Sequence, residues 1–357
     1  MNWGESSLGA DSAIGTNEHS PSDNTLYPVG NQSISFKASM KNWVCRFGTL
    51  KWRMSLNGSN GGPRLTLVDD TEPGVGLHLI GTGVGSPLNM SVGGQRVASA
   101  CEYRFLEGYT SLLQNEGEDI LEELVGTYEI IRRPQIEEPG SLLEMAKRTS
   151  VALLVVGDPM QATTHVDLLL RCKERGILTT IHHAVSVVDV ICAGIGLQSY
   201  RFGRQVTLTF PHGGHLPTSP LEMIADNLLL GLHTLVLLDL DPTGSGSTTP
   251  SPMSPNGAIE VMEEMAKRLK DDPPPHLQGD SKESVRQHFR KKAVSRILEI
   301  GVRNLHGVIC SNMGGDYSKV ALGTLSELAG GEYDGIHSLV VTGDLLGMEE
   351  EALVRLN

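Results

Sequence analysis

Asp158 has the clearest setting for binding chemistry in this chain. It follows an apolar run, Val151 to Val156, that is rich in β-branched residues and typical of a fully buried parallel strand. Ligands of open α/β sheets bind just past the carboxyl ends of strands, where helix N-termini offer unpaired N–H groups. Residues 158–165 are therefore a candidate binding loop, although a carboxylate before Pro159 is also a common turn former.

Histidines are the other residues that could do chemistry. His182 and His183 are adjacent, and His212 and His215 form the segment PHGGH. Neither pair has a third ligand nearby or the HExxH context of a zinc enzyme, so we expect no metal. His165 is interpreted as a hydrogen-bonding residue at the start of a helix rather than a general base.

A glycine-rich segment, GTGVGS, begins at Gly81 and follows a short predicted strand, Gly76–Gly81. Its glycines permit close approach of the backbone. As a dinucleotide fingerprint it is defective, because Ser86 stands where a glycine or alanine belongs and no convincing acidic partner for a ribose stands at the end of a second strand. The chain also lacks a serine nucleophile elbow. No residue is assigned a catalytic role from the sequence.

The elements that must position these residues begin with a strand, loop and helix around Asp158. Thr164 and Asp167 have capping-box spacing, and Gly176 suits the position just after the helix. Further strands are predicted at 177–181, 207–210, 234–238 and 338–341. Helices are predicted at 91–100, at 219–230 and within 282–303. A further helix is predicted between two Pro-rich loops, of which the first ends at 255 and the second begins at 271.

Composition fits a protein with two ordinary α/β domains. The chain has 357 residues, of which 39% are hydrophobic and 20% charged. No run approaches a membrane span, and the N-terminus lacks a secretory signal, so we expect a cytoplasmic location. The formal net charge of −13 disfavours direct binding to nucleic acid. Five scattered cysteines are expected to be buried, reduced thiols.

The first 75 residues form a low-complexity extension rich in Gly, Ser, Asn and Asp, most of which is predicted to be disordered. Within it, residues 35–56 combine tryptophans with lysines and arginines. Two interpretations remain open for this piece: an amphipathic segment that docks on a partner or a membrane surface, and a marginal hairpin or loose tail.

Several segments resemble one known family in order and spacing. They are GTGVG at 81, LEGYTSLL at 106, GDPMQATTHVDLLLR at 157, GLQSYRFG at 196, GLHTLVLLDL at 231, MSPNGA at 253 and GTLSELAGGEYDGIHSLVVTG at 323. The family is diphthine synthase, a group of S-adenosylmethionine-dependent methyltransferases with the tetrapyrrole-methylase fold. The resemblance runs from about residue 77 to the C-terminus and does not cover the extension.

The resemblance implies an α/β fold of two domains, at 76–190 and 191–357, with the methyl donor in the cleft between them. Carried over by motif, the donor-binding positions are Val84, Asp158, Gln161, Ser186, Val187, Leu238, Ser311 and His337. Gln161 replaces the family's glycine, whereas Ser311 and Asn312 replace its alanine and arginine. Asp158 is expected to face the cleft, with a polar ligand or helix N–H groups satisfying its carboxylate.

The resemblance also implies the activity. The chain would use S-adenosylmethionine to methylate the modified histidine of elongation factor 2 in diphthamide biosynthesis, as a homodimer. The amino-carboxypropyl group on that histidine would be methylated in succession, with a final methyl ester in eukaryotic-type members. There are two alternatives. One is a tetrapyrrole methylase of the same fold, and the other is a binding or regulatory homologue that keeps the fold but no longer transfers methyl groups. The latter is motivated by the departures at Gln161, Asp189, Ser311 and Asn312 and by the long N-terminal tail.

Overall fold

The structure is a computed structural model that describes residues 73–114, 116–246, 249–273 and 281–355, together with the backbone of 42–47, 50–55 and 64–68. The chain forms two compact units, residues 1–69 and 70–357. No helix in the described part is long and apolar enough to cross a membrane.

The unit of residues 1–69 contains three strands, β1 (Asn42–Phe47), β2 (Leu50–Ser55) and β3 (Arg64–Val68). They pair in the antiparallel order β1-β2-β3. The hairpin of β1 and β2 agrees with one of the two interpretations of residues 35–56. Strand β3 has no counterpart in the sequence prediction, and most residues of the predicted extension lie outside the described ranges.

The unit of residues 70–357 begins with a five-stranded parallel sheet in the order β6-β5-β7-β4-β8. The central strand β7 has the buried sequence expected of a strand covered on both faces. Its bounds differ from the prediction by one residue. The strands are β4 (Gly76–Gly81), β5 (Tyr103–Glu107), β6 (Glu129–Ile131), β7 (Ser150–Val155) and β8 (Thr179–His182).

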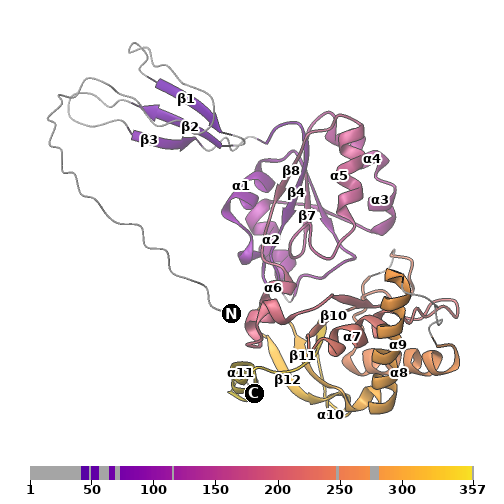
Figure 1. The fold of residues 1–357 in the computed structure, drawn as a ribbon. Coiled ribbons are helices and arrows are strands. Elements are labelled where there is room, and N and C mark those ends of the chain that lie inside the picture. Colours follow the sequence, from indigo (N-terminus) through magenta and orange to yellow (C-terminus); the bar gives the residue numbers. More distant parts are fainter. Residues whose placement is uncertain are drawn as a thin grey trace, which may run out of the picture. The chain divides into compact units, whose positions relative to one another are not determined.

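Alternate residues of β7 enter two separate cores. Ala152 and Leu154 pack with α1 and α2, whereas Leu153 and Val155 pack with α3, α4 and α5 on the other face (Figure 1). We call this sheet and its helices the first lobe. The helices are α1 (Val92–Ala100), α2 (Gly117–Val125), α3 (Arg133–Glu137), α4 (Gly140–Ala146) and α5 (His165–Glu174), with a short η1 (Pro87–Asn89).

The second lobe, residues 187–355, is built on a mixed sheet in the order β12-β11-β13-β10-β9. Only β9 and β10 pair in parallel, and the other neighbours are antiparallel. The strands are β9 (Val206–Leu208), β10 (Thr234–Leu238), β11 (His306–Ser311), β12 (Lys319–Thr324) and β13 (His337–Val341).

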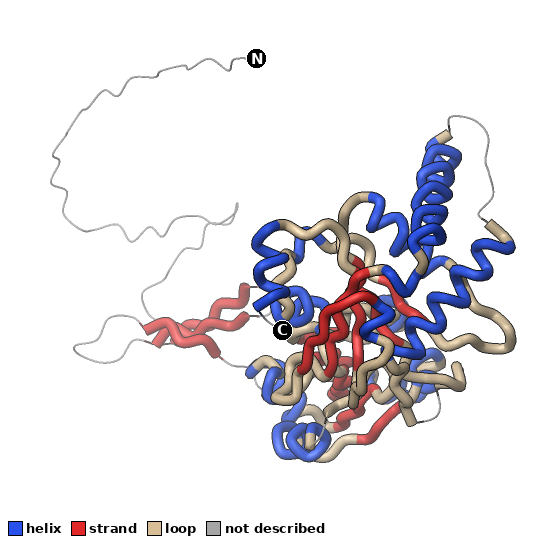
Figure 2. Tube along the Cα trace, turned by 90° about the horizontal axis from the view of Figure 1, so that it is seen from below, coloured by secondary structure: helices blue, strands red, loops and turns tan. Residues whose placement is uncertain are grey.

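Helices cover both faces of this second sheet, and Figure 2 shows strands enclosed by helices. One core gathers side chains of α7 (Ser219–Leu229), α8 (Pro255–Asp271), α9 (Lys282–Ile300) and α10 (Leu325–Leu328). The other gathers those of α6 (Val187–Gly194) and α11 (Gly347–Arg355). Because α6 packs on this sheet, the chain leaves the first lobe a few residues before the predicted boundary at 190. Short helices η2 (Ser199–Arg201) and η3 (Val302–Asn304) complete the lobe.

Local predictions around α5 had mixed outcomes. Gly176 comes directly after the C-cap of the helix and has φ of +66°, so its predicted position at the end of the helix is confirmed. The capping box at Thr164 is wrong, because Thr164 is the N-cap but its side chain accepts no capping hydrogen bond. Cys101, Cys172, Cys192 and Cys310 are free and buried, as expected for reduced thiols.

Candidate active site

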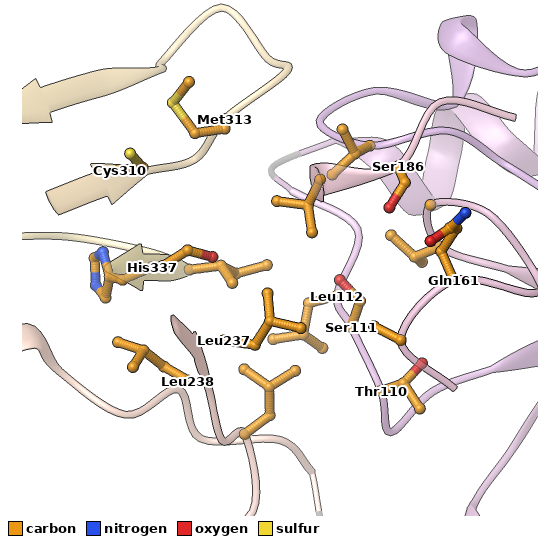
Figure 3. A pocket seen from close by; sticks show the side chains of 18 of the residues that line it. Thr110, Ser111, Leu112, Gln161, Ser186, Leu237, Leu238, Cys310, Met313 and His337 are labelled. Carbon is orange, nitrogen blue, oxygen red and sulfur yellow. The ribbon is translucent and has the colours of Figure 1, made fainter. Parts of the chain in front are cut away.

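A cavity lies where the carboxyl ends of the first-lobe strands face the second-lobe sheet (Figure 3). Its empty volume is about 850 Å³, a figure that includes space open to solvent. The described residues that line it are Val84, Thr110, Ser111, Leu112, Gln114, Val156, Gly157, Asp158, Gln161, Ala162, Ser186, Val187, Leu237, Leu238, Leu240, Cys310, Met313, Ile336, His337 and Ser338.

Seven of the eight predicted donor-binding residues line this one cavity. They come from segments spread over more than 250 positions of the chain, so only the tertiary fold brings them together. The eighth, Ser311, does not line the cavity. Its hydroxyl lies 2.9 Å from Nδ1 of His337, and both residues are buried. Ser311 therefore stands behind a lining residue instead of facing the cavity.

Asp158 connects two loops of the first lobe. It is 7% exposed, and one carboxylate oxygen accepts from the N–H of Met160 at 2.8 Å. The other accepts from the N–H of Ala184 at 3.2 Å and lies 2.8 Å from Nδ1 of His183. Loop N–H groups and an imidazole thus satisfy the carboxylate, and a ligand is not required for that. Asp158 shapes the cavity wall by holding the loop after β7 against the segment after β8.

The loop after Asp158 carries Gln161 at the cavity (Figure 3). Ala162 has φ of +53°, a left-handed conformation that costs a residue with a Cβ on the order of 1–3 kcal/mol. The loop is held in place at Pro159, whose carbonyl oxygen lies 2.8 Å from Nδ1 of the buried His165. The prediction that His165 hydrogen-bonds at the helix start is therefore confirmed.

Ser186 begins α6 as its N-cap. Its side-chain oxygen accepts from the N–H of Val188 at 3.3 Å, and Val187 follows as the first helical residue. Both Ser186 and Val187 line the cavity, so the N-terminus of α6 is one of its walls.

Sequence reasoning missed the segment 110–114, which lines the cavity through Thr110, Ser111, Leu112 and Gln114. Glu107, at the end of β5, orders the start of this segment. Its carboxylate accepts from the N–H groups of Tyr109 and Thr110 and from the Thr110 hydroxyl at 2.8 Å. A signal was present, because LEGYTSLL belongs to the resembled segments and directly follows a strand.

The second lobe supplies a mostly apolar wall. Leu237 and Leu238 end β10, Leu240 follows that strand, and Met313 follows β11. Burial raises the pKa of the Cys310 thiol to about 12, so it remains a neutral, unreactive side chain. Burial also lowers the pKa of His337, which favours a neutral imidazole beside Ser311.

Loops of the two lobes meet beside the cavity. The side-chain amide of Asn89 donates to the carbonyl of Val84 at 2.9 Å and to that of Gly314 at 3.2 Å. A Cβ on Gly85 would lie 2.0 Å from the carbonyl carbon of Gly314, and Gly85 has φ of +83°. The backbones can approach this closely only because both positions are glycine.

Asn312 holds the loop after β11 where the resembled family has arginine. Its φ is +52°, a value that asparagine tolerates better than most residues. Its side chain accepts from the N–H of Ile336 at 3.1 Å and donates to the carbonyl of Asp334 at 2.9 Å. The substitution therefore fixes the segment that enters the cavity wall at Ile336.

No group of three or more His, Cys, Asp or Glu side chains arranged for a metal ion occurs in the described ranges. His212 and His215 pair through their backbone amides, which makes PHGGH a tight turn.

Comparison with known proteins agrees with this architecture. Residues 76–277 match the family of Tetrapyrrole (Corrin/Porphyrin) Methylases. The chain is a methyltransferase of that class, with its two α/β lobes and a cavity between them.

Individual relatives narrow the class. A diphthine synthase of Methanoregula boonei is 34% identical over 78% of this chain and 98% of its own length. Diphthine methyl ester synthase 2 of Candida albicans is 34% identical over 75% of this chain and 84% of its own length. A crystal structure of diphthine synthase superimposes with a TM-score of 0.62 and 27% identity, covering 78% of this chain and 95% of that one. This chain belongs to the diphthine synthase family.

Proposed function

We propose that this chain transfers methyl groups from S-adenosylmethionine to the modified histidine of elongation factor 2. The observation that carries the proposal is the convergence of Val84, Asp158, Gln161, Ser186, Val187, Leu238 and His337 on one cavity. The names of the relatives, diphthine synthase and diphthine methyl ester synthase, supply the reaction. The alternative of a tetrapyrrole substrate has no comparable support among these relatives.

The residues present fit a donor of this kind. Leu237, Leu238 and Val187 offer an apolar surface suited to an adenine ring, and the first lobe offers polar groups at Thr110 and Gln161. When bound, S-adenosylmethionine would supply an electrophilic methyl group on a sulfonium. The chain would then hold the donor and acceptor in line, because positioning is what such a transfer demands of the protein.

The lining has a consequence for the acceptor. None of the cavity residues in the described part is Lys or Arg. An acceptor carboxylate therefore cannot form an ion pair with the wall, and the side-chain amides of Gln161 and Gln114 are among the hydrogen-bond donors that line it. Gln161 accordingly contributes hydrogen-bonding capacity that the family's usual glycine lacks.

The proposal is tested in two stages. Titration calorimetry should first detect binding of S-adenosylmethionine to the full chain. Mass spectrometry should then detect methyl additions on elongation factor 2 that carries the unmethylated amino-carboxypropyl histidine. Donor binding without any methyl addition would favour a homologue that binds without turnover, and absence of donor binding would overturn the proposal.

Location and assembly are proposed on the same basis. An elongation factor substrate places the reaction in the cytoplasm, and the resembled family predicts a homodimer. Light scattering of the purified chain measures its mass directly, and a monomeric mass would contradict the dimer.

A further inference from the structure

His183 is an exposed base attached to the cavity wall. Its side chain is 67% exposed, whereas that of its partner Asp158 is 6% exposed. Since the Asp158 carboxylate can only accept at this contact, Nδ1 of His183 carries the proton and donates it across 2.8 Å. This arrangement fixes the tautomer and leaves Nε2 as an acceptor with access to solvent.

The other ionisable groups of the cavity are already engaged or inert. The Asp158 oxygens receive the N–H groups of Met160 and Ala184 as well as the imidazole. His337 is buried with Nδ1 at Ser311, and Cys310 is buried as a neutral thiol. Among the described residues that form the wall or bond directly to it, His183 is thus the base that can exchange a proton with water.

Methylation of an amine uses the neutral form of that amine. An α-amino group is largely an ammonium ion near neutral pH, with an ordinary pKa of ~8 or above. Only the neutral amine has a lone pair for attack on the methyl carbon. Each successive methylation of the nitrogen releases one further proton, so a proton acceptor is needed at every step.

Building on the proposed function, we propose that His183, oriented by Asp158, accepts the proton of the acceptor amine. The proton passes from the acceptor nitrogen to Nε2, and the nitrogen lone pair then forms the bond to the methyl carbon. The electron pair of the broken carbon–sulfur bond stays on sulfur. His183 then returns its proton to water, which its exposure permits. The charged or titratable groups that face it are Asp158 and the neighbouring His182.

The test compares His183→Gln with His182→Gln in the full chain. His182 is the adjacent residue, and its Nε2 lies 3.2 Å from the Thr180 hydroxyl. At neutral pH, His183→Gln should lower kcat for the first amine methylation by roughly 10²- to 10⁴-fold, the usual contribution of general acid–base catalysis. Its affinity for S-adenosylmethionine, its affinity for the acceptor measured without donor, and its melting temperature should match the wild type.

The pH dependence of the methylation rate is a second measurement. It would be the same in the variant and the wild type if His183 had only a structural role. As the pH rises, the acceptor amine loses its proton to solvent, so the rate of His183→Gln should approach that of the wild type. A variant that methylates normally at neutral pH overturns the proposal, as does a loss of rate that alkaline buffer does not restore or that parallels a loss of donor affinity. If the wild-type chain binds no S-adenosylmethionine, the proposed function itself is overturned, and the role of His183 that rests on it is overturned too.

Discussion

Each lobe buries one glutamate beside one histidine, and the two pairs have different positions relative to the cavity. In the first lobe, Oε2 of Glu107 lies 3.6 Å from Nε2 of His165. In the second, Oε1 of Glu349 lies 3.3 Å from Nε2 of His233. All four side chains are fully buried.

The pair of the first lobe joins two segments of the cavity wall. Glu107 orders the segment that begins at Thr110, and His165 holds the loop of Gln161 through the Pro159 carbonyl. The pair of the second lobe joins α11 to the beginning of β10, the end opposite Leu238. There Glu349 also accepts from the N–H groups of Gln198 and Leu346.

This difference shows that residue type and burial do not identify a functional position. Both carboxylates accept buried N–H groups and should stabilise the fold, but Nε2 of His165 has no hydrogen-bond partner in the described part, whereas Nε2 of His233 bonds to Glu349. Only the pair at the carboxyl ends of parallel strands can transmit a change to the cavity. The following predictions separate these two roles.

The largest effect on stability is expected for Glu349→Ala. The change leaves the N–H groups of Gln198 and Leu346 without their acceptor in a buried site, and should lower the free energy of unfolding by roughly 3–5 kcal/mol. Denaturant unfolding measures this loss, with exposed Glu350→Ala as the control. Donor affinity by calorimetry should remain that of the wild type, and a weakened donor would show that the second pair also governs the cavity.

Glu107→Gln should affect stability less and the cavity more. The amide keeps the volume but weakens the hydrogen bonds to Tyr109 and Thr110, at a cost of about 1–3 kcal/mol in unfolding free energy. Because the segment 110–114 then loosens, the dissociation constant for S-adenosylmethionine should rise about tenfold, equivalent to ~1.4 kcal/mol. Exposed Glu122→Gln is the matched control. Unchanged donor affinity would place Glu107 with Glu349 as a purely stabilising residue.

Acid should destabilise the second lobe through its pair. Burial lowers the pKa of His233, so the unfolded state binds the proton more readily and stability falls as the pH drops below ~6.5, by at most about 1.4 kcal/mol per pH unit for one group. Burial opposes ionisation of Glu349, but the N–H groups of Leu346 and Gln198 hold its pKa below the ordinary value. Its contribution is present above ~4.3 and is lost as the pH falls through the folded-state pKa.

The measurement for this prediction is urea unfolding as a function of pH. Stability should decline from neutral pH downward in the wild type, and exposed His288→Gln should decline with the same slope. A wild-type stability that rises on acidification would show that the folded state binds the extra protons, which contradicts the buried, neutral state inferred for His233.

Ser311→Ala should have the smallest effect. It removes the hydroxyl beside Nδ1 of His337 and restores the alanine of the resembled family, at a cost of about 1 kcal/mol for one hydrogen bond. Since Ser311 does not line the cavity, its replacement should change the affinity for S-adenosylmethionine by less than tenfold. A tenfold or larger loss, ~1.4 kcal/mol, would mean that the orientation of His337 controls donor binding.

Local sequence pattern determined the elements around the cavity with little error. Strand β4 was predicted with its observed bounds, and β7 within one residue, because buried apolar runs bounded by glycine and proline leave few alternatives. Ser186 begins α6 through its capping side chain, and Gly176 follows α5 with the left-handed backbone that glycine adopts readily. The family resemblance predicted which eight residues should share a donor-binding site. Seven of those eight residues line one cavity.

Tertiary structure alone decided how those residues are used. The Asp158 carboxylate is satisfied by groups from residue 160 and from residues 183–184, a pairing that depends on the parallel register of β4 with β7 and β8. Ser311 bonds to His337 because the β11–β13 register places the two residues opposite each other, on one face of the sheet. Equally, no sequence pattern separates the Glu107–His165 pair from the Glu349–His233 pair. Partners of buried polar groups are chosen by long-range packing, whereas strands and helix ends are chosen by residues a few positions apart.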